Sequence, residues 1–457
     1  MGPAPRIEPR GVSRWYVAVL AVMAGAIRIP MWASSTHITF DEGVFLASTD
    51  LATAGFTQYR DFFASQGPLF IPLLHLGDLL GFGDPRGART IMVISGMAIA
   101  VATYFILTTF ASKRSSFLIA VLVATSGTTL YAAGPVQSEG AALAFALAAF
   151  AVTLHREDRS GALIAGVLVG SAVAIKNLHV APTVLMVAIV LAYRRDWLNL
   201  AYTSLVALTV ALATALFYGV ERVFDQYVMF HLTKDNSANL LDNLGHSLSF
   251  LVDFDLPLLV LAVASLILLW RAPERSKIPP EGVPSWLPVA WMVSSLIVII
   301  GFTHIDPGFI RVVAFLIPPL ALLIAHNLHM PVRILFGLVA LSVVFQVATI
   351  EFTPEPDPAN LAAIDRLEML GEETMVVSDD PGLAWSARRL SHPATVDPSY
   401  ARFQTGYLTP EMVERALTDP RTCAFTSTSE RFDNSGIAPP GIYQPTDVPG
   451  VYLRDGC

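Results

Sequence analysis

Two adjacent carboxylates follow the first long apolar segment of the chain. They are Asp41 and Glu42, in the stretch TFDEG at positions 39–43. A hydroxyl is a poor nucleophile at neutral pH, so a carboxylate within hydrogen-bond reach must accept its proton while a new bond forms. Asp41 is therefore a candidate general base for a single displacement with inversion, and Glu42 is a candidate supporting or ligand group. The alternative is that both acids are solvated and stabilised by the dipole of a helix N-terminus.

Three further ionisable residues stand at the ends of later apolar spans. Glu139 lies where one span begins, and an ionisable group at a membrane edge that faces a bundle interior is a candidate site residue. Lys176 and Arg311 are candidate phosphate-binding residues, because fixed cations stabilise the charge that develops on a departing phosphate. The alternatives are a helix-start acid for Glu139 and snorkelling for the two cations.

The remaining candidates for substrate binding lie in polar loops. Arg60, Asp61 and Gln66 belong to the long polar stretch after the first span, and His304 belongs to a short loop between later spans. His304, together with a nearby acid, has the chemistry of a divalent metal ligand, but no spacing in the chain is specific for a metal. We therefore expect no certain cofactor and leave a divalent metal open.

The composition is that of a membrane protein. Of the 457 residues, 54% are apolar and 14% are charged, whereas soluble domains carry roughly 25% charged residues. The net charge is −8, and no basic block indicates nucleic-acid binding. The two cysteines, Cys423 and Cys457, both lie in the C-terminal tail and are too few for a disulfide scaffold. An oxidising compartment would allow them to pair, but a terminal Cys457 is equally compatible with a free thiol.

Long apolar runs predict about eleven transmembrane helices. The predicted spans are 15–33, 88–111, 115–133, 139–155, 161–176, 178–193, 197–218, 249–270, 284–302, 309–326 and 332–350. The segment 67–80 is apolar but short, since its fourteen residues reach only about 21 Å as a helix against a hydrocarbon core of about 30 Å. We predict that it is an interfacial or re-entrant helix.

The distribution of lysine and arginine gives the orientation. With 67–80 not counted as a span, the predicted inside positions hold ten basic residues and the outside positions hold four, which agrees with the positive-inside rule. The inside residues are Lys113, Arg114, Arg156, Arg159, Arg194, Arg195, Arg271, Arg275, Lys277 and Arg333, and the outside residues are Lys176, Arg222, Lys234 and Arg311. We predict a multi-pass plasma-membrane protein with a retained signal anchor, a cytoplasmic N-terminus and an extracytoplasmic C-terminal domain.

Two regions lie outside the bilayer in this arrangement. The outer loop 34–87 includes a predicted amphipathic helix at 42–55, and a second loop, 219–248, is long enough to fold over a site. After position 351 a proline-rich linker leads to predicted short strands at 375–378, 424–427 and 451–454 and to a helix at 410–417 with Thr409 as its N-cap. We expect residues 1–350 to form a transmembrane catalytic module and residues 351–457 a small soluble α/β domain on the outer face.

The order and membrane side of these motifs resemble the GT-C superfamily of polyprenyl-phosphate-sugar-dependent glycosyltransferases, and within it the protein O-mannosyltransferase and lipid A aminoarabinose transferase group. The matching points are FDE at 40–42, YRD at 59–61, QGPL at 66–69, Glu139, a Gly-rich span that ends in Lys176, and Arg311 before a Pro-containing span. The likeness covers roughly residues 14–350. Gln66 and Gly67 stand where relatives with a metal site carry Glu-Lys, which puts metal dependence in doubt.

The resemblance implies an all-α polytopic GT-C-like fold in which Asp41 is the catalytic base, Glu139 supports it, and Lys176 and Arg311 bind the lipid phosphate. The implied activity is that of an inverting hexosyl or pentosyl transferase. It would move a sugar from a polyprenyl-phosphate donor to an acceptor hydroxyl on a protein, lipid or cell-wall glycan at the outer face of the plasma membrane. Two alternatives stay open. One is a transporter or flippase, which predicts paired repeats and ionisable groups near mid-membrane, and the other is a non-catalytic envelope assembly protein whose tail is the binding module.

Overall fold

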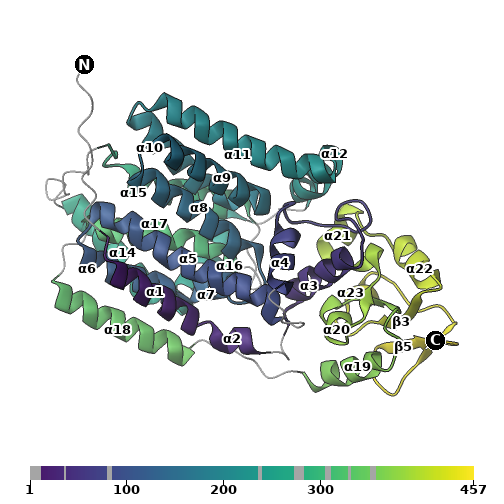
Figure 1. Ribbon diagram of the computed structural model, residues 1–457. Helices are drawn as coiled ribbons and strands as arrows, with labels where there is room; N and C mark the ends of the chain where they lie inside the picture. Colours follow the sequence, from purple (N-terminus) through teal and green to yellow (C-terminus); the bar gives the residue numbers. More distant parts are fainter. Residues whose placement is uncertain are drawn as a thin grey trace. The chain divides into compact units, whose positions relative to one another are not determined.

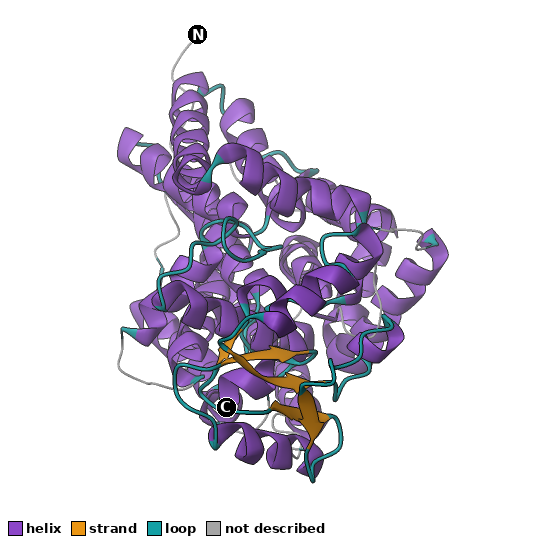
Figure 2. Cartoon of the chain, turned by 90° about the vertical axis from the view of Figure 1, so that its right-hand side faces the viewer, coloured by secondary structure: helices purple, strands orange, loops and turns teal. Residues whose placement is uncertain are grey.

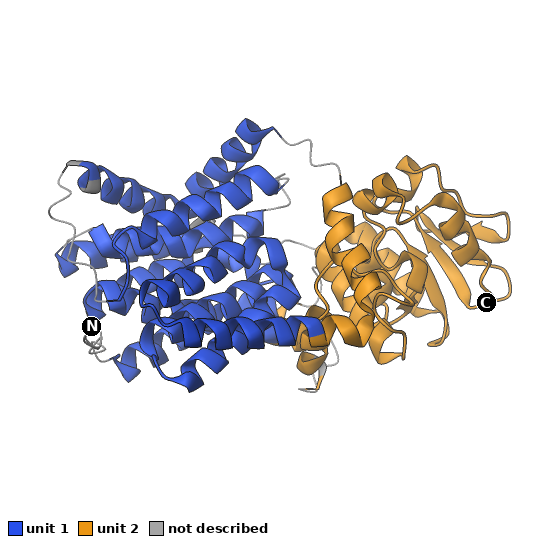
Figure 3. Ribbon diagram, turned by 90° about the horizontal axis from the view of Figure 1, so that it is seen from above, with its two compact units in different colours: residues 1–32, 91–212, 236–352 blue, residues 33–90, 213–235, 353–457 orange. Residues whose placement is uncertain are grey.

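The chain forms two compact units, each assembled from several stretches of sequence (Figure 3). The computed structural model describes residues 12–34, 38–79, 85–234, 239–271, 282–303, 310–327, 331–349 and 357–457. Unit 1 comprises residues 1–32, 91–212 and 236–352, and unit 2 comprises residues 33–90, 213–235 and 353–457. The division into a transmembrane module at 1–350 and a soluble domain at 351–457 stays a prediction.

Helices occupy every predicted span in the part of the chain that the structure describes (Figure 1). They are α1 (Arg14–Ala26), α2 (Ile29–Ala33), α5 (Arg86–Phe110), α6 (Lys113–Thr125), α7 (Gly127–Ala132), α8 (Ser138–His155), α9 (Arg159–Ile175), α10 (Asn177–Tyr193), α11 (Trp197–Tyr218), α14 (Leu240–Arg271), α15 (Leu287–Phe302), α16 (Ile310–Val313), α17 (Ile317–Asn327) and α18 (Val332–Thr349). Among the described residues, five helical segments are long and apolar enough to cross a membrane, and five shorter apolar helices accompany them. The chain is therefore a multi-pass membrane protein.

Helix α11 has the surface expected of a helix in contact with lipid. Only 6% of its apolar window is buried inside the protein, and Leu205 and Leu208 are each 63% exposed. Leaving this surface in water is unfavourable by roughly 25 cal/mol for each Å² of apolar area. In a bilayer the same surface is solvated by acyl chains, while the helix satisfies its own backbone hydrogen bonds.

Helix α9 is held close to α11 by two glycines one helical turn apart. A Cβ atom at Gly166 would lie 2.8 Å from the Thr203 carbonyl oxygen, and one at Gly170 would lie 2.7 Å from the Ala207 carbonyl oxygen. Only glycine allows the two backbones to approach this closely. The same contact fixes the position of the C-terminal end of α9, where Lys176 follows.

The predicted span 115–133 is divided into α6 and α7 by a hydrogen-bonded turn at Ser126. The Ser126 hydroxyl accepts a hydrogen bond from the Thr129 amide at 3.2 Å and so caps α7. The fully buried Asp255 carboxylate accepts hydrogen bonds from the Gly127 amide at 3.0 Å and from the Thr128 hydroxyl at 2.7 Å. Asp255 also has non-helical dihedral angles and kinks α14. The backbone amides of Gly127, Thr128 and Thr129 at this break thus find acceptors within the protein, as the hydrocarbon region requires.

Helix α3 (Phe40–Thr53) is packed on several sides within unit 2. The helix predicted at 42–55 is present, but the prediction of a single apolar side is wrong, because Glu42, Ser48 and Thr49 are buried as well. Helix α20 (Pro381–Ser386) covers α3 closely, since a Cβ atom at Gly43 would lie 2.5 Å from the Gly382 amide nitrogen. An apolar cluster completes the packing and consists of Ala47, Leu51, Phe62 and Val396. The short helix predicted within 67–80 is α4 (Phe70–Asp78), which has nine residues.

The region 219–248, predicted as an outer loop, is largely helical in its described residues. Helix α12 (Val220–Val223), the π-helical turn η1 (Phe224–Met229) and α13 (Phe230–Thr233) occupy its first part, and α14 begins at Leu240. The Gln226 side chain anchors η1 on the first outer loop, because it donates to the Tyr59 carbonyl at 2.9 Å and accepts from the Ala64 amide at 3.1 Å. Gln226 is far from both partners in sequence, so local patterns did not reveal this helical segment.

The C-terminal part of unit 2 contains a five-stranded sheet (Figure 2). The strand order is β2-β1-β3-β5-β4, in which β1 (Met375–Ser378) is parallel to β2 (Leu390–Ser391) and β3 (Thr422–Thr426), and β5 (Val451–Arg454) is antiparallel to β3 and to β4 (Tyr443–Pro445). The helices of this region are α19 (Pro358–Glu368), α20, α21 (Tyr400–Thr405), α22 (Pro410–Thr418) and α23 (Arg431–Asn434). The predicted strands at 375–378 and 451–454 are confirmed, β3 begins two residues before its prediction, and Thr409 stands at the N-cap of α22 as predicted.

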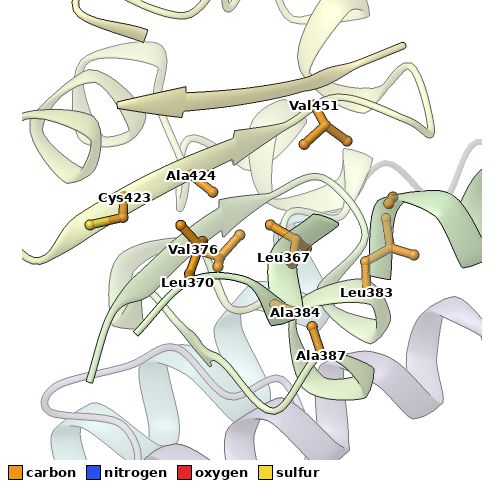
Figure 4. Packing of buried hydrophobic residues seen from close by; sticks show 10 residues of the cluster. Leu367, Leu370, Val376, Leu383, Ala384, Ala387, Cys423, Ala424 and Val451 are labelled. Atoms are coloured by element: carbon orange, nitrogen blue, oxygen red, sulfur yellow. The ribbon is translucent and has the colours of Figure 1, made fainter. Parts of the chain in front are cut away.

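Two apolar clusters lie on opposite faces of this sheet. Val376 and Ala424 belong to one cluster (Figure 4), whereas their neighbours Val377 and Phe425 belong to the other. The alternation follows from the two-residue period of a strand. A disulfide joins Cys423 to Cys457, with Cα atoms 5.7 Å apart, so the pairing that the sequence left open is formed. The all-α membrane fold with a small C-terminal α/β region is thus confirmed.

Candidate active site

Unit 1 brings together three of the predicted site residues in one charged cluster. The Lys176 ammonium lies 3.0 Å from the Glu139 carboxylate, and the Arg311 guanidinium lies 3.5 Å from the same oxygen. Their side chains are largely enclosed, with exposed fractions of 13% for Lys176, 14% for Arg311 and 3% for Glu139. Sequence separation alone would not place them together, so this meeting is a property of the fold.

Each member of the cluster stands at a helix boundary. Glu139 is in the first turn of α8, where the helix dipole also favours a negative charge. Lys176 is the single extended residue between α9 and α10, with φ −149° and ψ 108°. Arg311 is the second residue of the short helix α16. Because all three residues stand at helix ends, their side chains meet without a kink inside a long membrane helix.

The cluster contains two cations and one carboxylate, so these three residues carry a formal net charge of +1. The Ser138 hydroxyl also donates to the Glu139 carboxylate at 3.2 Å. Two cations held close to one carboxylate create a local positive potential that attracts an anion. The arrangement therefore suits a bound anion, and a phosphate would form charge-assisted hydrogen bonds with both cations.

Unit 2 places Asp41 and Glu42 in the first turn of α3, capped by Thr39. The Thr39 hydroxyl accepts a hydrogen bond from the Glu42 amide at 3.4 Å. Asp41 is half-buried, whereas Glu42 is fully buried. Of the two adjacent acids, only Asp41 is accessible to a substrate hydroxyl.

Glu42 forms a bidentate ion pair with Arg89 at the start of α5. The two N–O distances are 2.7 and 2.8 Å, and each side chain is 1% exposed. Arg89 also donates to the Ser34 carbonyl oxygen. A paired and buried carboxylate of this kind holds α3 in place and has no free face for a substrate.

Residues of the C-terminal tail surround the N-terminal turn of α3. The Arg431 guanidinium lies 3.7 Å from the centre of the Phe40 ring, in a cation–π contact. Burial raises the pKa of Asp397, Arg402 opposes the rise, and the negative charge of Asp41 adds to it. The charge of Asp41 thus acts on Asp397 within this unit, which makes the tail part of the surroundings of the predicted base.

Arg402 connects the tail to the first outer loop. Its guanidinium lies 4.3 Å from the centre of the Phe63 ring and donates to the carbonyl oxygens of Asp397 at 2.6 Å and Tyr407 at 2.8 Å. Burial lowers the pKa of Arg402 to about 10, so the side chain remains charged at neutral pH. The loop that carries other predicted site residues is therefore braced by a buried cation.

Arg60 and Asp61 pair with each other at the surface of that loop. The Arg60 guanidinium donates to the two Asp61 oxygens at 3.0 and 2.8 Å, and the Thr57 amide donates to Asp61 at 2.7 Å. The hydrogen bonds from Arg60 and then from Thr57 lower the pKa of Asp61 to about 2. The carbonyl oxygen of Gln66 accepts a hydrogen bond from the Tyr59 hydroxyl. These contacts shape the loop, and any contact of these residues with substrate stays a prediction.

The possible metal ligand His304 lies outside the described residues, as does Asp306. Among the residues that the structure describes, no group of three or more His, Cys, Asp or Glu side chains is arranged to hold a metal ion.

Sequence reasoning missed three arginines that organise the site, namely Arg89, Arg402 and Arg431. Arg89 had a signal, because an arginine inside a predicted apolar span needs a partner in the membrane region. Arg402 and Arg431 had none, since a cation among surface-type residues of a soluble region is ordinary. Their partners became visible only in the folded chain.

Solved structures share this fold. No family model and no curated relative matches the sequence. ArnT from Cupriavidus metallidurans, bound to undecaprenyl phosphate, matches with a TM-score of 0.64 and 14% identity over 96% of this chain and 97% of that chain. The Archaeoglobus fulgidus oligosaccharyltransferase in complex with Zn and sulfate matches with a TM-score of 0.53 and 15% identity over 91% of this chain and 68% of that one. The archaeal oligosaccharyltransferase AglB from the same organism, in complex with an inhibitory peptide and a dolichol-phosphate, gives 0.52 and 12% over 91% and 70%. At these identities the likeness shows the fold alone, and the chain has the polytopic membrane fold of these proteins.

Proposed function

We propose that this protein is an inverting glycosyltransferase that uses a polyprenyl-phosphate sugar as donor and an acceptor hydroxyl on a protein, lipid or cell-wall glycan. The observation that carries the proposal is the cluster of Glu139, Lys176 and Arg311, whose two cations exceed its one carboxylate. The fold shared with ArnT bound to undecaprenyl phosphate supports a lipid phosphate as the anion.

The proposed step is a single displacement at the anomeric carbon of the sugar. The acceptor oxygen forms a bond to that carbon while the bond from the carbon to the phosphate oxygen breaks. The acceptor proton passes to the Asp41 carboxylate. The electron pair of the broken bond stays on the phosphate, where Lys176 and Arg311 stabilise it. Glu139 holds the two cations in place between turnovers and limits how tightly the phosphate product is retained.

We assign Glu42 a positioning role in this reaction. Its ion pair with Arg89 fixes the N-terminal turn of α3 and therefore the position of Asp41. Arg60, Asp61, Gln66 and His304 are proposed to contact the donor sugar or the acceptor. Binding energy at such positions supplies the orientation that a reaction between two substrates needs.

We place the reaction at the outer face of the plasma membrane. The excess of basic residues in the predicted inside loops supports this orientation. The Cys423–Cys457 disulfide supports it as well, because disulfides persist in oxidising compartments and are rare in the cytosol.

The direct test is to incubate the purified full-length protein with radiolabelled polyprenyl-phosphate hexoses and pentoses and a membrane extract. We expect label from one donor to appear in an acceptor, and the Asp41→Asn variant to lose this transfer. Asp365→Asn, at an exposed acid of α19, is the matched control and should transfer normally. Failure of every polyprenyl-linked sugar to bind would contradict the proposal and would favour a transporter or an assembly protein.

A further inference from the structure

A cavity in unit 2 is separate from the residues of the proposed reaction. It has a volume of about 780 Å³ and is lined by the C-terminal half of α3, by α4 and by the tail around α20 and β2. The lining includes Thr49, Asp50, His75, Trp385 and Arg388. A cavity of this size lies in the range of small-molecule sites, which is roughly 300–1,000 Å³.

Helix geometry separates this cavity from Asp41. Asp50 follows Asp41 by nine residues on the same helix. Nine residues of α-helix advance about 14 Å and turn the side chain by about half a revolution. Asp41 and Asp50 therefore face opposite sides of α3 and cannot serve one reacting centre.

The lining combines an aromatic face with many polar groups. Trp385 is half-buried and packs on the apolar cluster under α3, which fixes the indole. The Thr53 hydroxyl and the His75 ring also line the cavity, and the Thr53 hydroxyl and the His75 ring nitrogen are 3.4 Å apart. A rigid aromatic face beside several hydrogen-bonding groups suits a ligand that is flat on one side and rich in hydroxyls.

Arg388 stands at the edge of the cavity in an unusual backbone conformation. Its φ is +56°, in the left-handed region that a residue other than glycine adopts at a cost, and its side chain is exposed. The next residue, Arg389, is buried and donates to the carbonyl oxygens of Glu368 at 2.7 Å and Arg388 at 3.0 Å. This bracing holds the strained turn, and strain of this kind is concentrated at functional sites.

The charges of the lining select against anions. Asp50, Glu368 and Glu372 supply three carboxylates, against the two guanidinium groups of Arg388 and Arg389. A phosphate or another polyanion would meet a net negative wall, so electrostatics disfavours it. The polar lining also disfavours an acyl chain, because it would desolvate groups that a hydrocarbon cannot satisfy.

We propose that this cavity binds a neutral sugar segment of the acceptor glycan, and this inference rests on the proposed function. One sugar ring would lie against Trp385, with its hydroxyls donating to the carboxylates and accepting from Arg388. The site would hold the acceptor chain some distance from the hydroxyl that reacts. It thereby assigns a role to the tail and narrows the acceptor class from protein, lipid or glycan to glycan.

The test is saturation-transfer NMR on the full-length protein in detergent, with maltotriose, mannotriose and arabinotriose as neutral probes. We expect at least one trisaccharide to bind, and both Trp385→Ala and Arg388→Gly to weaken its binding by tenfold or more. Arg388→Gly should unfold at the same temperature as the natural protein or a higher one, because glycine adopts φ +56° without strain. Arg415→Ala, at an exposed arginine of α22, is the matched control and should bind the probe normally.

Three results would overturn the inference. They are no binding of any trisaccharide, unchanged binding by Arg388→Gly, and displacement of the probe by inorganic phosphate. Its failure is distinguishable from failure of the proposed function. If the cavity binds sugar but no polyprenyl-linked donor is used, the transferase proposal fails and the sugar site stands. If donor transfer depends on Asp41 but no probe binds, the sugar site alone fails.

Discussion

Replacing Glu42 by glutamine separates a positioning role from a chemical one. In Glu42→Gln, the Arg89 guanidinium stays buried and loses a carboxylate that now lies at 2.7 and 2.8 Å. Removing one partner of a buried ion pair costs about 3–5 kcal/mol, because the other charge is left without compensation. Both side chains are 1% exposed, so water cannot replace the lost partner.

The expected result is a large loss of thermal stability. For a compact unit of 150–250 residues, each kcal/mol shifts the melting temperature by about 2–4 °C, so the change should be about 6–20 °C. The assay is thermal unfolding of the purified protein in detergent, together with the rate of sugar transfer well below the melting temperature. The double variant Glu42→Met with Arg89→Met removes both charges and should recover most of the lost stability.

Two results would contradict a positioning role for Glu42. If Glu42→Gln melts like the natural protein but loses transfer, Glu42 acts in the chemistry and not through the position of α3. If the double variant is as unstable as the single one, the ion pair is not the source of the stability. Either result would contradict the role of the Glu42–Arg89 ion pair in positioning Asp41.

Three further changes test other parts of the structure. Lys176→Met and Arg311→Met should each weaken binding of polyprenyl phosphate, measured by titration calorimetry, by about 10- to 150-fold. This factor corresponds to the loss of one charge-assisted hydrogen bond of about 1.5–3 kcal/mol. Binding equal to that of the natural protein would count against the phosphate site. Burial raises the pKa of Asp397 above its ordinary value. The ionised carboxylate therefore lowers the free energy of unfolding at every pH above that raised pKa. The loss of stability disappears as the pH falls toward the pKa of an unfolded aspartate, about 3.9. Asp397→Asn should therefore raise the melting temperature at pH 7 and lose this advantage near pH 4, whereas a lower melting temperature at pH 7 would show that the attraction to Arg402 dominates. Reducing the Cys423–Cys457 disulfide, which closes a loop of sequence separation 34, should cost about 3–4 kcal/mol, and an unchanged melting temperature in dithiothreitol would contradict this.

The membrane helices could be predicted from sequence because their signal is local. A run of apolar residues long enough to cross a bilayer identifies itself, and α8, α9, α10 and α11 match their predicted spans within two residues at each end. The strands β1 and β5 were equally visible, since short apolar runs between turn residues predict them. The helices within 219–248 were not predicted, because η1 depends on hydrogen bonds between the Gln226 side chain and the first outer loop.

The candidate site could be predicted in its residue types and only partly in its geometry. Glu139, Lys176 and Arg311 were found because ionisable residues at the ends of spans are few, but nothing in the sequence placed both cations within 3.5 Å of the Glu139 carboxylate. The pairing of Glu42 with Arg89 was not predictable either, because 47 residues separate them and spacing carries no information at that range. Long-range pairing is decided by packing, which a single sequence does not display.

The central claim is that Asp41 accepts the proton of the acceptor hydroxyl. The measurement is single-turnover transfer from a radiolabelled polyprenyl-phosphate sugar by Asp41→Asn, with donor binding measured on the same preparation. Because general-base catalysis contributes about 10²- to 10⁴-fold, we predict a loss of transfer in that range with donor affinity and melting temperature unchanged. Transfer by Asp41→Asn at the rate of the natural protein would contradict the account.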